Sequence, residues 1–351
     1  MTQTIKQVVG IDVAQNELVC CLGSISLDMQ PKLYAHNTFQ NNTRGFETLV
    51  QWVNKHADSG LAVRYVMEAT GVYHESLAYW LAEKGCSLSV VLPNKISNFF
   101  RTLDIKTITD KTSSQAIATF GLQRHLDDWK RPNPLFKRLR QLVRERDQVI
   151  QERTTIKNQL HAESAEAQPG KTSLERMKKR LTLLNKQVLE IKDEIEALVK
   201  SKEEVKSDVK RICSITGVGI LTAATVLAET NGFELIRNKR QLTSYAGLDA
   251  REKQSGTSVA GKARISKKGN KYLRKAMYMP ALSAIRCEGR SKEIFTRLVS
   301  KHGIKMKALV AVQRKLLEMI YTMYKTRRDY DPNYMDKKVE SNQRLLSTQA
   351  D

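Results

Sequence analysis

The sequence lacks any long apolar run. None of its 351 residues fall in a window that approaches the roughly 18 consecutive apolar residues of a transmembrane helix, and the N-terminus lacks the apolar core of a signal peptide. Neither a membrane span nor secretion is indicated, and we expect a cytoplasmic protein. The hydrophobic share of 41% is typical of a globular chain, and the length allows two or three domains with separate cores.

Cysteine is scarce and scattered. The five cysteines form no CxxC pair and have no histidine at the spacing of a metal site: Cys20, Cys21, Cys86, Cys213 and Cys287. This pattern argues against a zinc site and against a disulfide framework. We expect these side chains to serve as small buried apolar groups.

Acidic residues are too few to balance the basic ones. The chain has 37 Asp and Glu against 59 Lys and Arg, a formal net charge of +22. A chain this basic usually works on a polyanion, and counterion release from nucleic acid would supply much of the affinity. A membrane surface is the weaker alternative, because no basic amphipathic helix with an aromatic-rich apolar face is present.

The first 130 residues have the pattern of an α/β domain. Their order is β-β-β-α-β-α-β, with strands expected at 7–13, 17–22, 32–39, 63–68 and 87–92 and helices at 43–52 and 74–83. In an RNase H-like (RuvC-like) sheet this order would place the first and fourth strands side by side.

Three carboxylates in this domain lie at the ends of predicted strands or helices, where we expect each to face a partner because burying an unpaired carboxylate is unfavourable. Asp12 and Glu68 each end an apolar strand, and Asp110 stands at the expected start of a helix. If the first and fourth strands are neighbours, Asp12 and Glu68 would point into one site, with Asp110 as a third ligand for a cation. The alternatives are a turn aspartate at Asp12 and an ordinary helix N-cap at Asp110.

Residues 131–212 read as long charged helices. Apolar residues recur there at spacings of three, four or seven, and residues 165–172, which contain Pro169 and Gly170, break the pattern. The spacing predicts a coiled-coil hairpin that serves as a dimerisation arm. The alternative is a long helical spacer without a partner chain.

Residues 213–328 form the expected C-terminal domain, and two of its stretches are unusual. The first contains Gly217 and Gly219 and resembles a helix-hairpin-helix turn, whose backbone N–H groups bind a phosphate. The same glycines equally suit two closely packed helices. A polar tail is expected at 329–351.

The second unusual stretch is basic and carries Ser255 between polar and glycine residues. The cations expected to bind a phosphate backbone are Lys253, Lys262, Arg264, Lys267, Lys268, Lys271 and Arg274. No histidine lies within this stretch, which argues against a Ser-His-Asp hydrolase. Taken by composition alone, the segment around Ser255 also fits a flexible Ser/Gly loop.

Five motifs occur in one order and together resemble those of the IS110-type insertion-sequence transposases, which are similar to the Piv DNA invertases. The motifs, from about residue 7 to residue 325, are GIDVAQNELVCCL, MEATGVY, TDKTSSQAIATFG, ITGVGILTAATVLAE and SYAGLDAREKQSGTSVAGKARISKKGNKYLRKA. The resemblance implies a RuvC-like domain with an acidic tetrad, a coiled-coil dimerisation region and a mostly α-helical C-terminal transposase domain with a nucleophilic serine.

Residue by residue, the resemblance assigns Asp12, Glu68 and Asp110 to the first three acids of the tetrad and Ser255 to the serine. The fourth acid is absent, because Ser113 stands where the family pattern has an aspartate. The resemblance also implies Mg²⁺ or Mn²⁺ as cofactor, a guide (bridge) RNA, DNA as element end and target, a homo-oligomer of two or four chains, and a bacterial, nucleoid-associated location.

The function expected from the sequence is therefore that of an RNA-guided DNA transposase or recombinase. It would cut and rejoin strands through a serine nucleophile assisted by carboxylate-bound metal. The alternatives are a RuvC-like structure-specific nuclease, a site-specific DNA invertase, and a catalytically impaired copy that only binds nucleic acid, which Ser113 makes more attractive.

Overall fold

The computed structural model describes residues 3–69, 71–103, 105, 107–234, 236–251, 254–255, 259–260 and 264–331. The chain divides into two compact units, Met1–Arg131 and Pro132–Asp351. Each unit is described by itself.

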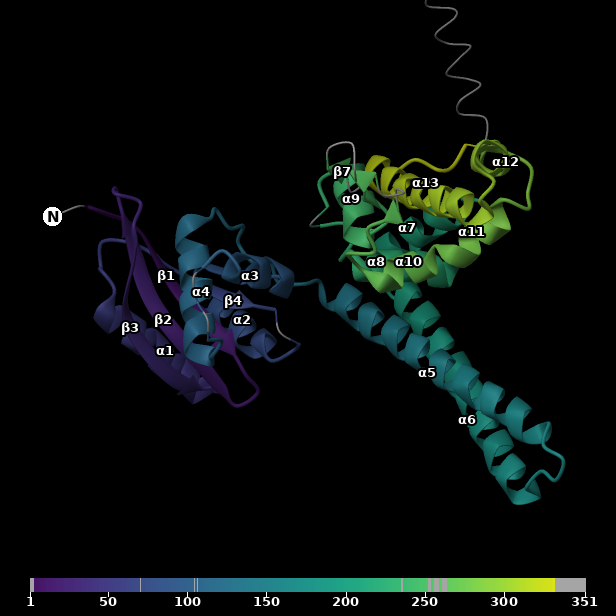
Figure 1. The fold of residues 1–351 in the computed structure, drawn as a ribbon, viewed down its shortest axis with the longest axis horizontal. Helices are drawn as coiled ribbons and strands as arrows, with labels where there is room; N and C mark the ends of the chain where they lie inside the picture. Colours follow the sequence, from purple (N-terminus) through teal and green to yellow (C-terminus); the bar gives the residue numbers. More distant parts are fainter. Residues whose placement is uncertain are drawn as a thin grey trace, which may run out of the picture. The chain divides into compact units, whose positions relative to one another are not determined.

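The first unit is built on one five-stranded mixed sheet (Figure 1). Its order is β3-β2-β1-β4-β5, with β1 at Thr4–Val13, β2 at Glu17–Ser26, β3 at Pro31–Gln40, β4 at Val63–Glu68 and β5 at Leu88–Val91. β2 runs antiparallel to both β1 and β3, whereas β4 is parallel to β1 and β5 is parallel to β4. This arrangement is an RNase H-like α/β sheet, and the predicted pairing of the first and fourth strands is confirmed.

Helices cover both faces of this sheet. They are α1 (Thr43–His56), α2 (His74–Glu83), α3 (Pro93–Phe100) and α4 (Asp110–Gln123). Val9 and Ile11 belong to the apolar cluster that includes α1 and α2, whereas Val8 belongs to the cluster that includes α3 and α4. This alternation follows from the period of two along a strand, and it makes β1 the buried centre of the unit.

Gly10 allows α4 to lie directly on β1. A Cβ atom at this position would stand 2.2 Å from the backbone nitrogen of Ala118 and 2.4 Å from the carbonyl oxygen of Ser114. Backbone atoms cannot give way like the end of a flexible side chain, so only glycine fits here. The close approach fixes the start of α4 relative to the end of β1.

The second unit is mostly helical and begins with a long hairpin. The helices α5 (Pro134–Ser164) and α6 (Lys171–Lys200) run side by side in opposite directions (Figure 1). Near the base, Leu139 and Leu142 of α5 and Ile195 of α6 belong to the same apolar core as the helices that follow. The sequence pattern suggested that α6 continued to residue 212, but α6 ends at Lys200 and α7 begins at Glu203.

Seven helices and four short strands complete the described part of the second unit. They are α7 (Glu203–Cys213), α8 (Ile220–Glu229), α9 (Lys239–Ala246), β6 (Ala250–Arg251), β7 (Gln254–Ser255), β8 (Val259–Ala260), β9 (Arg264–Ile265), α10 (Lys271–Ala276), α11 (Tyr278–Ala284), α12 (Arg290–His302) and α13 (Lys305–Thr326). Residues 271–284 form two short helices that meet at Met277.

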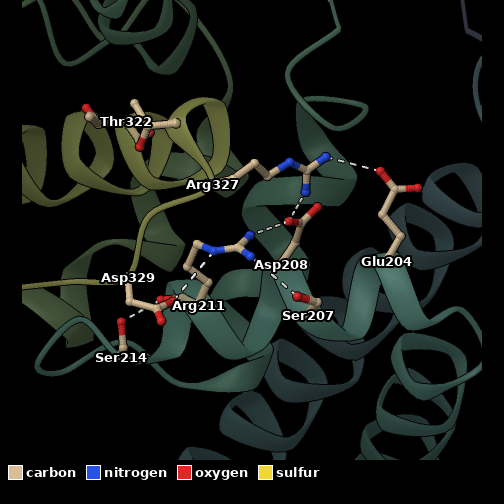
Figure 2. Close-up of polar contacts among 9 residues, drawn as sticks. Glu204, Ser207, Asp208, Arg211, Ser214, Thr322, Arg327 and Asp329 are labelled. Atoms are coloured by element: carbon tan, nitrogen blue, oxygen red, sulfur yellow. Dashed lines mark hydrogen bonds and ion pairs between the residues drawn. The ribbon is translucent and has the colours of Figure 1, made fainter.

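A buried ion-pair network joins α7 to the end of α13 (Figure 2). Asp208 is 3% exposed and accepts a hydrogen bond of 2.8 Å from Arg211, one turn further along α7. It also pairs with Arg327, which ends α13 in the left-handed conformation and reaches Glu204 at 3.1 Å. A carboxylate taken out of water needs such cations, and Asp208 therefore holds the last helix in place.

We expect Asp208→Asn to destabilise the second unit by about 2–3 kcal/mol, since it removes the buried carboxylate that pairs with both Arg211 and Arg327 and leaves Arg211 only the exposed Asp329, at 3.6 Å, as a charged partner. All three tryptophans, Trp52, Trp80 and Trp129, lie in the first unit. In urea unfolding, the helical circular dichroism should therefore shift to lower denaturant while tryptophan fluorescence does not.

The matched control is Glu203→Gln, which removes an exposed ion pair with Lys206 in the same helix. It should cost less than about 0.5 kcal/mol. An Asp208→Asn protein with an unchanged circular-dichroism transition would contradict the proposed role of the network.

Candidate active site

Asp12 and Glu68 lie at the same edge of the sheet. Asp12 is the penultimate residue of β1 and Glu68 is the last residue of β4. The two strands are parallel, and the pairing of Ile11 with Met67 places the two acids at adjacent ends. Both side chains are partly buried. Asp12 is a strand residue, because the turn of the β1–β2 hairpin begins only after Val13.

The start of α4 supplies the third acid. Thr109 is the N-cap of α4, and its side chain and that of Thr112 form reciprocal hydrogen bonds with each other's backbone N–H. Asp110 is therefore the first residue of the helix, exposed to solvent, and not its cap. Ser113 lies three residues further, so the two side chains share one face of the helix.

The electrostatics of Asp12 place the three acids near one another. Burial, then the charge of Asp110, then that of Glu68 raise the pKa of Asp12 to about 6, while hydrogen bonds from the Val13 N–H and the Ser113 hydroxyl oppose the rise. Like charges disfavour ionisation, and a cation among them would restore it. Ser113, at the position of the missing fourth acid, thus acts as a hydrogen-bond donor to Asp12.

The oxygen ligands and the negative charge of these three side chains suit a hard divalent cation. Carboxylate oxygens are the ligands that Mg²⁺ and Mn²⁺ prefer, and three mutually repelling carboxylates leave a site that favours positive charge. As the side chains stand, no group of three or more His, Cys, Asp or Glu within the described residues is gathered closely enough to enclose a metal ion. The chemistry of the residues fits a metal, while their present spacing does not form a complete ligand shell.

The basic stretch of the second unit forms a two-tiered hairpin. β6 pairs with β9, and β7 pairs with β8, with Ser255 opposite Val259. The side chain of Ser255, and all of Lys253 and Lys262, lie outside the described part of the chain. The exposed cations of this stretch are Arg251, Arg264, Lys267, Lys268 and Lys271.

Arg274 differs from these exposed cations. Its guanidinium is partly buried and donates to the backbone carbonyls of Ala246 at 2.8 Å and Gly269 at 3.1 Å. Its side chain therefore holds two segments of the second unit together.

Gly217 and Gly219, the two glycines of the Gly-Val-Gly turn, have different structural roles. Gly217 has φ +89°, and a Cβ there would lie 2.7 Å from the carbonyl oxygen of Pro280 in α11. Gly219 is the N-cap of α8 and has open space where a side chain would be. Close packing therefore explains Gly217, whereas Gly219 leaves the first N–H groups of α8 approachable.

Sequence reasoning missed a buried acid in the second unit. Glu229, the last residue of α8, is 2% exposed and binds Arg144 of α5 and Asn270, the N-cap of α10. The available signal was the same as for Asp12 and Glu68, since Glu229 ends an apolar run. Its partners lie 85 and 41 residues away, where no local pattern reveals them.

Comparison with known proteins agrees with the motifs. A family model for IS110 DEDD transposases matches residues 9–163, and a model of the transposase IS116/IS110/IS902 family matches residues 209–296. The chain belongs to the IS110-type transposase family. The expectation of a DNA transposase or recombinase enzyme is thereby confirmed.

Relatives of this IS110-type transposase include proteins of similar length. The pilin gene-inverting protein of Moraxella bovis is 28% identical over 339 residues, covering 93% of this chain and 98% of that protein. The transposase for insertion sequence element IS1111A of Coxiella burnetii is 29% identical over 166 residues, 44% of each chain.

A solved structure of Thermus thermophilus RuvC is similar over 35% of this transposase and 99% of that chain, with 10% identity and a TM-score of 0.28. Within the part of the transposase that the structure describes, no helix combines the length and apolar character needed to cross a membrane.

We expect Asp12→Asn to stabilise the first unit at pH 7.5 in the absence of divalent ions. An unfolded aspartate has a pKa near 3.9, against about 6 in the folded chain. The folded state thus binds the proton more tightly, and stability falls as pH rises from about 4 to about 6. Removing the charge should restore about 1 kcal/mol at pH 7.5, after allowance for the partial exposure of the carboxylate, and almost nothing at pH 4.

The measurement is urea unfolding followed by tryptophan fluorescence at both pH values. Asp28→Asn, which changes an exposed carboxylate after β2, is the control and should shift stability by less than about 0.5 kcal/mol at either pH. An Asp12→Asn protein that is no more stable than the unsubstituted chain at pH 7.5 would refute the repulsion.

Proposed function

We propose that this transposase cuts and rejoins DNA through Ser255, with a divalent cation held by Asp12, Glu68 and Asp110 and with target choice guided by an RNA. The observation that carries the proposal is the grouping of three acids from β1, β4 and α4 in a chain of the IS110-type family. Membership of the family gives the reaction class, and the acids and the serine give the chemistry.

The metal requirement rests on the charge of the acidic site. Mg²⁺ or Mn²⁺ bound there would orient the scissile phosphate and neutralise the charge that develops on it. Asp12 would lose its proton more readily beside a cation, so occupancy and ionisation favour each other. The hydroxyl of Ser113 would keep one oxygen of Asp12 in place.

The serine step forms one bond and breaks one bond. The Ser255 oxygen attacks phosphorus, the bond between phosphorus and the 3′ oxygen breaks, the serine proton is released, and the departing 3′ oxygen takes up a proton. Attack by a 3′ hydroxyl on the resulting phosphoserine link would reverse these changes and rejoin the strand. Lys253, Lys262 and Arg264 would stabilise the charge on the phosphate, and Lys267, Lys268 and Lys271 would hold its flanks.

Incubation of the protein and its RNA with labelled element-end DNA and Mg²⁺ should give a protein–DNA adduct that survives denaturation. Ser255→Ala should abolish it, because no other group is proposed to attack, and chelation of the metal should reduce it by at least about a hundredfold. Ser258→Ala, a nearby serine, is the matched control and should form adduct normally. Adduct that persists in Ser255→Ala would refute the nucleophile assignment.

A site-specific invertase is the second candidate. It is favoured by the Moraxella bovis pilin gene-inverting protein, which is similar to this chain over 93% of its residues. Inversion would use the same serine step and differ only in which ends are rejoined. A RuvC-like nuclease would instead use metal-bound water and give strand breaks without adduct, and a non-catalytic copy would bind nucleic acid and give neither.

The RNA and the oligomer are further parts of the proposal. The net charge of +22 suits an RNA together with two DNA duplexes. A groove of about 750 Å³ between α5 and α6 is lined by Ile156, Leu183 and Leu184, and Leu183 is 55% exposed, which suits a second hairpin packed on the arm.

Both parts can be tested on one preparation, expressed together with the DNA that flanks its gene. Light scattering should give the mass of two or four chains, and sequencing of the copurified nucleic acid should return one non-coding RNA. Leu183→Glu should lower the mass toward one chain without unfolding the protein, whereas the exposed Lys186→Glu should not. A single-chain mass would exclude the arm as an assembly surface, and random RNA would exclude the guide.

A further inference from the structure

Two paired chain segments of the second unit precede and follow the β7–β8 hairpin, which carries Ser255. We define the neck as residues 244–251 and 264–270, which flank the β7–β8 hairpin. Its two sides are joined by backbone hydrogen bonds from Ser266 to Asp249 at 2.9 Å, from Lys267 to Gly247 at 3.1 Å and from Asn270 to Tyr245 at 2.7 Å. The Ser266 hydroxyl adds a bond of 2.5 Å to the Asp249 carboxylate.

The two sides of the neck approach as closely as backbones can. Gly269 has φ +154°, and a Cβ there would lie 2.4 Å from the carbonyl oxygen of Tyr245 and 2.8 Å from the nitrogen of Gly247. Because the sides cannot move apart without losing these bonds, whatever holds one end of the neck also fixes β6 and β9, the pair of strands that precedes and follows the β7–β8 hairpin in the chain.

Glu229 holds both sides of the neck at once. Its carboxylate accepts 2.6 Å from the side-chain amide of Asn270, and its backbone carbonyl accepts 3.0 Å from the hydroxyl of Tyr245. The side-chain oxygen of Asn270 in turn caps α10 by accepting from Tyr272 and Leu273 at 2.9 and 3.1 Å. The end of α8, the neck and the start of α10 therefore meet at a single carboxylate.

Arg144 completes the anchor from a fourth element. Its Nε and Nη2 donate to the two oxygens of Glu229 at 2.7 and 2.8 Å, and its guanidinium stands over the ring of Tyr272, 4.7 Å from the centroid. A bidentate pair fixes the plane of the carboxylate as well as its place. The Glu229 oxygen that accepts from Asn270 is therefore held in a fixed orientation.

A network of this kind does more than add stability. Apolar residues of the same size would fill such a position without the cost of burying a charge, whereas a satisfied polar network fixes one arrangement among several. Catalytic groups need that fixity, since a displacement of about 1 Å can cost a hundredfold in rate.

We propose that Glu229 is a positioning residue for Ser255, acting through Asn270 and Tyr245 to aim the hairpin that carries the nucleophile. The inference rests on the proposed serine step. Glu229 touches neither DNA nor the reacting atoms in this scheme, so its loss changes how often Ser255 is correctly placed and leaves DNA binding largely intact.

The sharpest test is Asn270→Asp. An aspartate keeps the oxygen that caps α10 but cannot donate to Glu229, and it places a second carboxylate against it. We expect DNA affinity within about threefold of the unsubstituted protein and an adduct rate lower by at least about tenfold. Asn270→Ser, whose hydroxyl can cap α10 but is too short to reach Glu229 as the amide does, should also lower the rate.

A double variant tests whether the hydrogen bond between residues 270 and 229 matters, as opposed to the identity of either residue alone. The double variant Asn270→Asp with Glu229→Gln reverses donor and acceptor across the same bond and keeps the net charge. Because the amide nitrogen introduced at position 229 would replace the Oε2 oxygen that also accepts from Arg144, we expect the variant to recover part, and not all, of the adduct rate. Asp208→Asn is the control, because it removes a buried acid elsewhere in the same unit and should leave the rate unchanged at temperatures where the protein is folded.

A second readout does not depend on activity. Hydrogen exchange of residues 245–251 and 264–270 should accelerate in Asn270→Asp and return in the double variant, while exchange in the core of α8 stays the same. An Asn270→Asp protein with the unsubstituted adduct rate would overturn the positioning role and leave the serine step standing. Absence of any Ser255-dependent adduct in the unsubstituted protein would overturn both.

Discussion

The constraint on which the first unit depends is the repulsion among carboxylates that the fold holds at one edge of its sheet. Burial first, and then the charges of Asp110 and Glu68, raise the pKa of Asp12 to about 6. The parallel pairing of β1 with β4 and the packing of α4 on β1 keep the three acids in place against that repulsion. The stability of the surrounding core thus offsets the electrostatic cost of holding three carboxylates close together.

In the second unit, by contrast, the buried acids are paired with arginine. Asp208 and Glu229 are each almost fully enclosed, and each is held by arginine from a distant segment, Arg327 in one case and Arg144 in the other. The Asp208–Arg327 pair fixes the end of α13, and the Glu229–Arg144 pair fixes the end of α8 against α5. Each of these buried carboxylates therefore already has a cationic partner. The contrast is between carboxylates paired with arginine in the second unit and carboxylates held close to one another in the first.

Much of the first unit could be predicted because its signals are local. Apolar runs that end in an acid marked Asp12 and Glu68, and the strand order predicted that they would be neighbours. The helix α3 was missed, since it has only eight residues and begins at Pro93, shortly after a strand. Whether Asp110 capped its helix or began it depended on Thr109 and Thr112, whose reciprocal bonds no pattern of hydrophobicity reveals.

The second unit was harder to predict because its decisive contacts are long-range. The sequence marked the basic stretch and Ser255, but the β6–β9 and β7–β8 pairs are two residues long and leave no alternating pattern. The heptad spacing continued through Lys202, although the helix breaks there, because the apolar residues on both sides face the same core. Glu229 gained its meaning only from partners brought in by folding.

Gly10 has a consequence for how copies of such a chain lose activity. It carries no reactive group and contacts no acid directly, yet any side chain there would meet the backbone of α4 at 2.2 Å, where ordinary contacts begin near 3.4 Å. The helix would have to shift, and Asp110 and Ser113 would move away from Asp12 with it. A defective element can therefore retain every acid of its site and Ser255, and differ from a working one by a single methyl group in the middle of a strand.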